Sequence, residues 1–201
     1  MSWLSPRFDA VLAVLRGAAR SDDELAAWIE NRFGVDVVET TLDREHRRER
    51  LTVWVRTAEQ LAPFTDATGN WDREAQAAIA ARVGRDLAVI ADAVEPELRR
   101  RAVDTIDEAR ILDATAVLDD PQTVWHVSAI LGRVFVFLQT DAQVASLRGS
   151  AQHGRLVAAL WELASANDEF GVLARAEFLP VVDSKQNIDE NFAGSTYNYF
   201  L

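Results

Sequence analysis

The chain of 201 residues contains no cysteine and only one lysine, Lys185. The absence of cysteine excludes disulfide bonds, thiol nucleophiles and zinc sites with cysteine ligands. It is compatible with a reducing compartment, and we therefore expect a cytoplasmic protein. We expect neither a secretory signal nor a membrane span, because a basic and then apolar leader is missing and no apolar run reaches about 18 residues.

Positive charge is also scarce. The 21 basic residues stand against 32 acidic ones, which gives a formal net charge of −11. The densest basic run, residues 44–50, is interrupted by Glu45 and Glu49. Because clustered cations drive binding to phosphates, nucleic acid is not expected as the main partner. An acidic surface suits either simple solubility or the binding of another protein, a basic one above all, and both interpretations stay open.

The pattern of apolar residues predicts an α+β fold. Apolar positions at helical spacing predict helices over residues 8–20, 22–33, 71–83, 97–118 and 155–166. Short apolar, β-branched runs predict strands over residues 35–42, 51–55, 87–91, 123–130, 134–138 and 177–182, with a last edge strand over 195–201. The polar tract 43–50 is expected to form a hairpin loop. We expect a mainly antiparallel sheet covered by helices.

Local capping signals support these elements. Ser21 and Glu24 have the spacing of a capping box, in which a hydroxyl and a carboxylate satisfy the free amides of a helix start. Thr57 and Gln60 have the same spacing. Gly34 is placed to take the left-handed conformation that ends a helix.

The two predicted hairpins resemble each other at an offset of 83 residues. Five of the fifteen aligned positions from Arg50 are identical: Arg50/Arg133, Val53/Val136, Thr57/Thr140, Gln60/Gln143 and Ala62/Ala145. This predicts an internal duplication of a helix-strand-strand-helix-strand module; the alternative is convergence on the same capping chemistry. The modules would cover residues 21–94 and 95–183, between a helix in 1–20 and a polar, aromatic tail in 184–201. We expect these segments to pack as one compact unit, with both hairpins in one antiparallel sheet.

One short pattern has the form of a catalytic motif. Asp183 and Lys185 follow the apolar run 178–182, a placement that resembles the acid-x-lysine signature of the restriction-endonuclease-like nucleases. The resemblance implies a carboxylate that binds a divalent metal and a lysine that positions the attacking water. It also requires a partner acid on the preceding strand, from Asp168, Glu169 or Glu177. The competing interpretation is an ordinary turn at the end of a strand.

Three further patterns do not complete a site. Asn187, Asp189 and Asn191 are spaced like calcium ligands, but Phe192 stands where an EF-hand requires glycine. The segment 149–156 imitates a phosphate loop without its lysine or its metal-binding hydroxyl. The histidines show no ligand spacing to one another: His46, His126 and His153. We therefore expect no bound metal and no cofactor.

Aromatic residues near both chain ends are candidate partner-binding anchors: Trp3, Tyr197, Tyr199 and Phe200. The alternative is that both ends dock on the protein's own surface. We expect a non-enzymatic, acidic protein-binding module that masks a partner, as an immunity protein or a secretion chaperone does. Two other functions stay open: a metal-dependent nuclease or hydrolase using Asp183 and Lys185, and a small-molecule sensor with a pocket between the modules.

Overall fold

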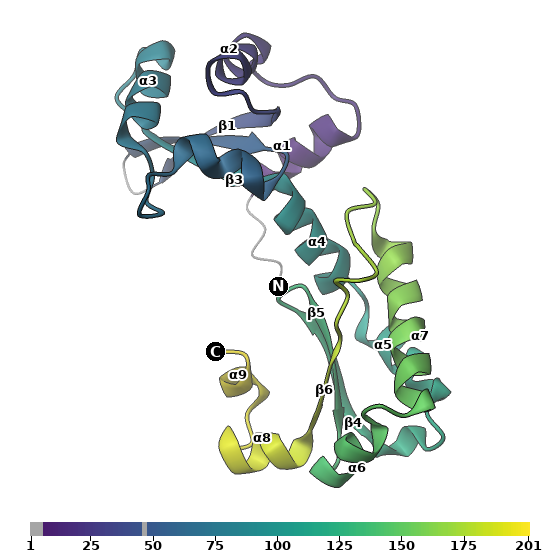
Figure 1. Cartoon of the computed structure of the whole chain (residues 1–201). Coiled ribbons are helices and arrows are strands. Elements are labelled where there is room, and N and C mark those ends of the chain that lie inside the picture. Colours follow the sequence, from purple (N-terminus) through teal and green to yellow (C-terminus); the bar gives the residue numbers. More distant parts are fainter. Residues whose placement is uncertain (1–5, 46–47) are drawn as a thin grey trace. The chain divides into compact units, whose positions relative to one another are not determined.

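The computed structural model describes residues 6–45 and 48–201, and the chain divides into two compact units (Figure 1). The first unit is Met1–Glu97 and the second is Leu98–Leu201. Each unit has its own three-stranded sheet covered by helices, so the predicted α+β class is confirmed. Both sheets are mixed and separate from each other, and the expectation that the two hairpins share one antiparallel sheet is wrong.

The first unit is built on the sheet β1-β2-β3. The strands β1 and β2 are antiparallel, and β3 pairs in parallel with β2. In chain order the elements are α1 (Pro6–Leu15), α2 (Asp23–Phe33), β1 (Val37–Glu45), β2 (Arg48–Val55), the 3₁₀ helix η1 (Ala58–Phe64), α3 (Arg73–Val83) and β3 (Ala88–Ala93). The helix α4 (Val94–Asp104) follows directly and contains the unit boundary.

The second unit repeats this arrangement with the sheet β4-β5-β6. Here β4 and β5 are antiparallel, and β6 is parallel to β5. In chain order the elements are α5 (Glu108–Ala114), the 3₁₀ helices η2 (Thr115–Val117) and η3 (Pro121–Thr123), β4 (Val124–Ile130), β5 (Arg133–Leu138), α6 (Asp141–Leu147), α7 (Ala151–Asn167), β6 (Val181–Ser184), α8 (Lys185–Asn191) and α9 (Thr196–Tyr199).

The repetition extends to individual backbone hydrogen bonds. The N–H of Arg56 donates to the carbonyl of Asp36 at 3.1 Å, and the N–H of Gln139 donates to that of Thr123 at 3.0 Å. Each hairpin has a register shift near the start of its first strand. In each unit the third strand leads into a helix without a loop. The repeated module is therefore a property of the fold as well as of the aligned residues.

Capping explains why both hairpins lead into helices. Complete capping boxes form at Thr57 with Gln60 and at Thr140 with Gln143, as predicted. Gly34 ends α2 in the left-handed conformation, also as predicted. The capping box expected at Ser21 is wrong, because Asp22 caps α2.

Several predicted elements differ from the observed ones. The helix expected over 97–118 is broken after Asp104, because Asp107 caps a new helix, α5. The loop expected over 43–50 is mostly strand, since β1 and β2 extend to a two-residue connection that lies outside the described residues. The edge strand expected over 195–201 is wrong: its centre forms the short helix α9.

Each sheet buries one apolar face under its helices. In the first unit this core joins β2 and β3 to α2 and α3 through Leu25, Ile29, Val53, Ile79 and Val89. In the second unit the corresponding core joins β5 to α5, α6 and α7. Four of its side chains are fully buried: Ile111, Val136, Leu156 and Leu160. No helix in the part of the chain that the structure describes is long and apolar enough to cross a membrane.

The hairpin of the second unit contains a strained turn. Leu131 and Gly132 both have positive φ, 56° and 72°, which is the type I′ geometry of a two-residue hairpin loop. Leucine is disfavoured there, and Leu131 is exposed. We expect Leu131→Asn to raise the free energy of unfolding by about 1 kcal/mol, because asparagine tolerates this conformation. Urea unfolding of both proteins measures the change, and an unchanged or lower value contradicts it.

Candidate functional site

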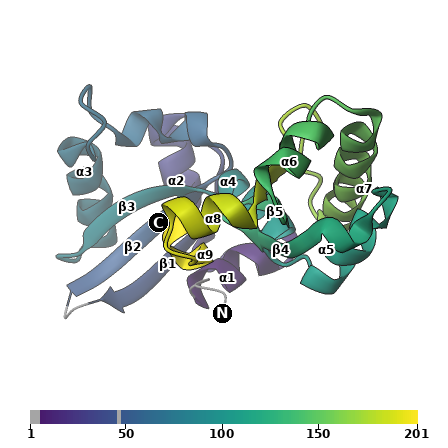
Figure 2. The same ribbon diagram turned by 90° about the horizontal axis from the view of Figure 1, so that it is seen from below.

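The first unit has two edge strands, β1 and β3, and a groove lies beside the edge of β1. Since the strand order is β1-β2-β3, only one side of β1 pairs with another strand. Figure 2 shows β1 at the edge of its sheet, with α1 beside it. A strand edge displays unpaired N–H and C=O groups, and proteins usually block such edges because they attract other strands.

The first half of this edge is blocked by side chains of the same unit. Arg20 donates to the carbonyl of Val37 at 3.0 Å, and the Val37 N–H donates to Glu30 at 3.3 Å. The Thr40 N–H donates to the Glu39 carboxylate at 2.6 Å, and the Ser21 hydroxyl oxygen lies 3.1 Å from the Thr40 carbonyl oxygen and covers it. These contacts stop a partner strand from pairing with residues 37–40.

Glu39 fixes this blocked part of the edge. Its side chain is only 2% exposed. Besides the Thr40 amide, it accepts hydrogen bonds from the Ser21 hydroxyl at 2.7 Å and from the Ser21 N–H at 3.2 Å. A buried carboxylate is tolerated only when it is well bonded, so these contacts hold β1 and the start of α2 in a single arrangement.

The second half of the edge opens into a groove of about 850 Å³. Leu42 lies in it with 48% of its surface exposed. On the α2–α3 side the groove is lined by Leu25 and Val83, and on the α1 side by Ala10, Thr41 and Asp43. Among the described parts of the chain, no side chain or loop forms a hydrogen bond with the N–H or the C=O of Leu42.

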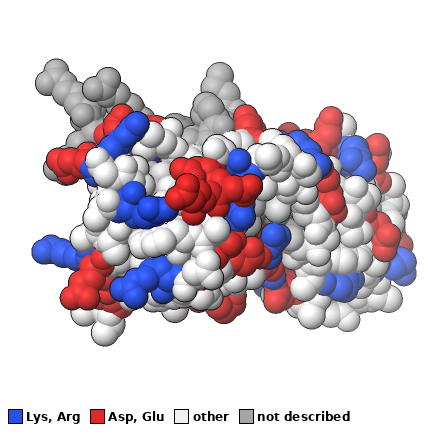
Figure 3. Space-filling model, turned by 90° about the horizontal axis from the view of Figure 1, so that it is seen from above, with Lys and Arg blue, Asp and Glu red and all other residues white. Residues whose placement is uncertain are grey.

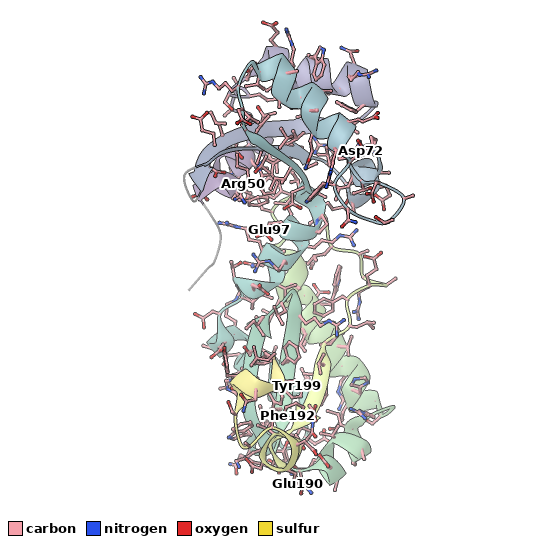
Figure 4. The ribbon with its side chains drawn as sticks, turned by 90° about the vertical axis from the view of Figure 1, so that its left-hand side faces the viewer. Arg50, Asp72, Glu97, Glu190, Phe192 and Tyr199 are labelled. Carbon is pink, nitrogen blue, oxygen red and sulfur yellow. The ribbon has the colours of Figure 1, made fainter. Side chains whose placement is uncertain are left out.

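Charged side chains border the groove in pairs of opposite sign. Arg82 of α3 forms an ion pair with Glu24 of α2, which ties the two helices together at the rim. Asp43 and Arg50 are opposite each other in the β1–β2 register, with Asp43 Oδ2 3.8 Å from Arg50 Nε. Figure 4 shows Arg50 on the first sheet. The rim is thus polar and the floor, around Leu25, is apolar.

Sequence reasoning missed this groove because it assigned 43–50 to a loop. The signal was the alternation of Thr41, Leu42 and Asp43, which continues the period of the preceding strand. The high charge of the following residues concealed the pattern. Which face each residue takes also depends on the register shift between Val37 and Glu39, and such a shift has no sequence signature.

The predicted catalytic pair lies at the junction of β6 and α8 in the second unit. The Asp183 carboxylate accepts hydrogen bonds from Asn187 at 3.0 Å and from the Tyr199 hydroxyl at 2.7 Å. Lys185 forms an ion pair with Asp189, and its Nζ lies 5.5 Å from the centre of the Trp125 ring. The side chains of Asp183 and Lys185 therefore have different partners, and the nuclease alternative stays a prediction.

Two of the three proposed partner acids of Asp183 have other partners. Glu177 forms an ion pair with Arg99, and Asp168 accepts the N–H of Leu173 at 2.7 Å. Within residues 6–45 and 48–201, no group of three or more histidine or acidic side chains is placed to hold a metal ion.

The terminal aromatic residues have different surroundings. Trp3 lies outside the described residues, and Tyr197 is 70% exposed. Tyr199 and Phe200 lie against the second face of the β4-β5-β6 sheet, where the Phe200 ring centre is 4.9 Å from that of Phe135. Phe192 packs in the same cluster, as Figure 4 shows. The segment α8–α9 thus covers this face.

Burial and the hydrogen bond to Asp183 raise the pKa of Tyr199 above its ordinary value of 10.0. Above pH 10 the tyrosine ionises more readily in the unfolded chain than in the folded one, so the unfolded chain binds fewer protons and stability falls as pH rises. We expect the second unit to lose stability above pH 10, and Tyr199→Phe to lose less over the same range. Urea unfolding at pH 8 to 11 measures the stability of the wild-type protein and of Tyr199→Phe. An equal pH dependence of the two proteins would contradict the raised pKa of Tyr199.

The negative charge is spread over both units. Twelve basic and eighteen acidic residues give the first unit a formal charge of −6, and nine and fourteen give the second −5. On the face that Figure 3 shows, basic and acidic side chains are intermixed, with uncharged residues between them.

Comparison with known proteins gives no functional lead: no protein-family model, curated protein or solved structure matches this chain. The function must therefore be argued from the geometry of the groove.

Proposed function

We propose that this protein is a non-enzymatic, acidic protein-binding module, and that the groove beside β1 is where a partner protein docks. The observation that carries the proposal is the half-open edge of β1. Its first part is blocked by Arg20, Ser21 and Glu39, while its second part, at Leu42, opens into a groove of about 850 Å³. A partner held there would be masked, in the manner of an immunity protein or a secretion chaperone.

The exposure of Leu42 also supports the proposal that a partner protein docks in the groove. Large apolar side chains at the surface are common singly, but here the exposed leucine stands over an apolar floor and within a polar rim. This arrangement of apolar centre and polar border is typical of protein–protein interfaces. The net charge of −11 favours a partner with basic residues.

Site-specific photocrosslinking in cells tests the proposal. The full chain carries p-benzoylphenylalanine in place of Leu42, and a matched control carries it in place of Leu179, which is 73% exposed in the second unit. We expect one discrete crosslinked protein from position 42, identified by mass spectrometry and then shown to bind the purified chain. No crosslink at position 42, or the same products from both positions, contradicts the proposal.

A further inference from the structure

We propose that two copies of this chain form a dimer by swapping the segment 195–201, which contains α9. In the swapped dimer, α9 of each copy covers the sheet face of the other copy at the place where it covers its own face in the monomer. The proposal concerns the second unit only and is independent of the groove beside β1. It rests on the strained turn before α9, the few contacts that hold α9 and the absence of charge on the swapped segment.

The turn between α8 and α9 holds its backbone in a strained conformation (Figure 1). It consists of residues 192–195, in which Ala193 and Gly194 have positive φ, 53° and 72°. The left-handed region is easy for glycine but unfavourable for alanine, whose Cβ lies too close to the following carbonyl oxygen. Ala193 is exposed, so burial of its side chain does not offset this cost. Short hinges under strain favour domain swapping, because the strain disappears when the hinge extends.

Few contacts hold α9 against its own sheet. In the part of the chain that the structure describes, one hydrogen bond joins residues 195–201 to the strands: the Tyr199 hydroxyl donates to the Asp183 carboxylate at 2.7 Å. The other contacts are between aromatic rings, such as those of Phe200 and Phe135, whose centres are 4.9 Å apart. Opening of α9 therefore breaks few interactions, and the α9 of a second copy forms all of them again.

The sheet face below α9 requires a cover in either form. Phe137 is fully buried there and Phe135 is 6% exposed, both beneath α8–α9. If α9 opened and nothing replaced it, these rings would meet water, which is unfavourable. The α9 of a second copy has the same residues as the α9 that the structure shows on this face. Its fit is therefore established by the contacts within one chain, and a second copy is the occupant that the structure favours.

Electrostatic repulsion does not oppose the swap at this face. The eleven residues 191–201 contain no charged side chain, although the chain as a whole has a net charge of −11. The Tyr199 hydroxyl that binds Asp183 is a neutral donor. Repulsion between the acidic bodies of two copies is screened at physiological salt, where the Debye length is about 8 Å.

The first unit contains the same junction with its last segment extended. The N–H of Glu95, at the start of α4, donates to the carbonyl of Arg56 at 3.1 Å. In the second unit the N–H of Gln186, at the start of α8, donates to the carbonyl of Gln139 at 3.3 Å. Whereas the chain turns after α8, α4 continues past the unit boundary, and Val103 in its last turn joins the core of the second unit. The segment after the third strand thus leaves its own sheet in one of the two repeats.

Sedimentation of the full-length chain and of two hinge variants tests the proposal. Ala193→Gly relieves the strain of the turn, whereas Ala193→Val increases it, because a β-branched residue is disfavoured at positive φ and favoured in an extended hinge. If each hinge changes the equilibrium about fivefold, the two hinges of a dimer change its dissociation constant about 25-fold. We expect a dimer of the unaltered chain, a dimer about 25-fold weaker in Ala193→Gly and one about tenfold tighter in Ala193→Val. Ala145→Gly, at an exposed position of α6, is the matched control and should not change the dissociation constant.

Nuclear Overhauser contacts between differently labelled copies show whether α9 is the swapped segment. One copy carries labelled tyrosine and the other labelled phenylalanine. Within one chain the ring centres of Tyr199 and Phe137 are 5.4 Å apart. In the swapped dimer this contact joins two copies and is observed between the two labels. A dimer that forms through another surface keeps the contact within each copy.

Three results would overturn the proposal. The first is a chain that stays monomeric both unaltered and as Ala193→Val. The second is a dimer with the same dissociation constant in Ala193→Gly and Ala193→Val. The third is a dimer without contacts between Tyr199 of one copy and Phe137 of the other. The crosslink at Leu42 tests the groove separately, so the proposed function and the swapped dimer stand or fail independently.

Discussion

Replacing Phe137 with alanine is expected to lower the free energy of unfolding of the second unit by about 4 kcal/mol. The ring is fully buried between the sheet and the segment α8–α9. It contacts the rings of Trp125, Tyr199 and Phe200. The substitution removes the apolar surface and leaves a cavity that these rings cannot all fill, which is why the effect is large.

Urea unfolding measures this change, and hydrogen exchange assigns it to the second unit. The matched control is Leu179→Ala, where the side chain is 73% exposed and a change below about 0.5 kcal/mol is expected. If α8–α9 docks as the structure shows, exchange should also accelerate at Ile188 in Phe137→Ala. A loss below about 1 kcal/mol, or unchanged exchange in α8, contradicts this packing.

Replacing Glu39 with alanine is expected to destabilise the first unit by about 3 kcal/mol. The change leaves the amide of Thr40 and the amide and hydroxyl of Ser21 without the carboxylate that now accepts their hydrogen bonds. It also frees the Thr40 N–H at the sheet edge. Urea unfolding measures the loss of stability.

Glu39→Gln separates hydrogen bonding from charge, because the amide oxygen still accepts bonds although it carries no charge. We expect a smaller loss than in Glu39→Ala. The exposed Glu74→Ala serves as the control, with a change of at most about 0.5 kcal/mol. Equal losses in Glu39→Ala and Glu74→Ala would show that the carboxylate does not hold β1 to the start of α2.

The elements that the sequence predicted best are those with local chemical signals. Thr57 with Gln60 and Thr140 with Gln143 form the expected capping boxes, since such boxes depend on residues three positions apart. The errors fall where local signals compete. Ser21 has the spacing of a cap, but Glu39, 18 residues away, holds its hydroxyl, so Asp22 caps α2 instead.

The third strand of each sheet shows a second limit of prediction from the sequence: a strand can be located without its pairing being known. Apolar runs near 87–91 and 177–182 indicate strands, and β3 and β6 lie at or close to these positions. Their parallel pairing with β2 and β5 is not encoded in either run. It follows from the helical crossover that returns the chain to the same end of the sheet before the strand begins.

The sequence alone determined that this cysteine-free, acidic chain folds as an α+β protein with a repeated module, because capping and periodicity are local properties. Only the tertiary structure decided that the repeats build two separate sheets and that β1 is an edge strand. The tertiary structure also decided that Glu39 and Ser21 block half of that edge while Leu42 stays exposed. Strand order, register shifts and contacts between distant residues depend on how the whole chain packs. The groove therefore emerges from the fold and not from a motif.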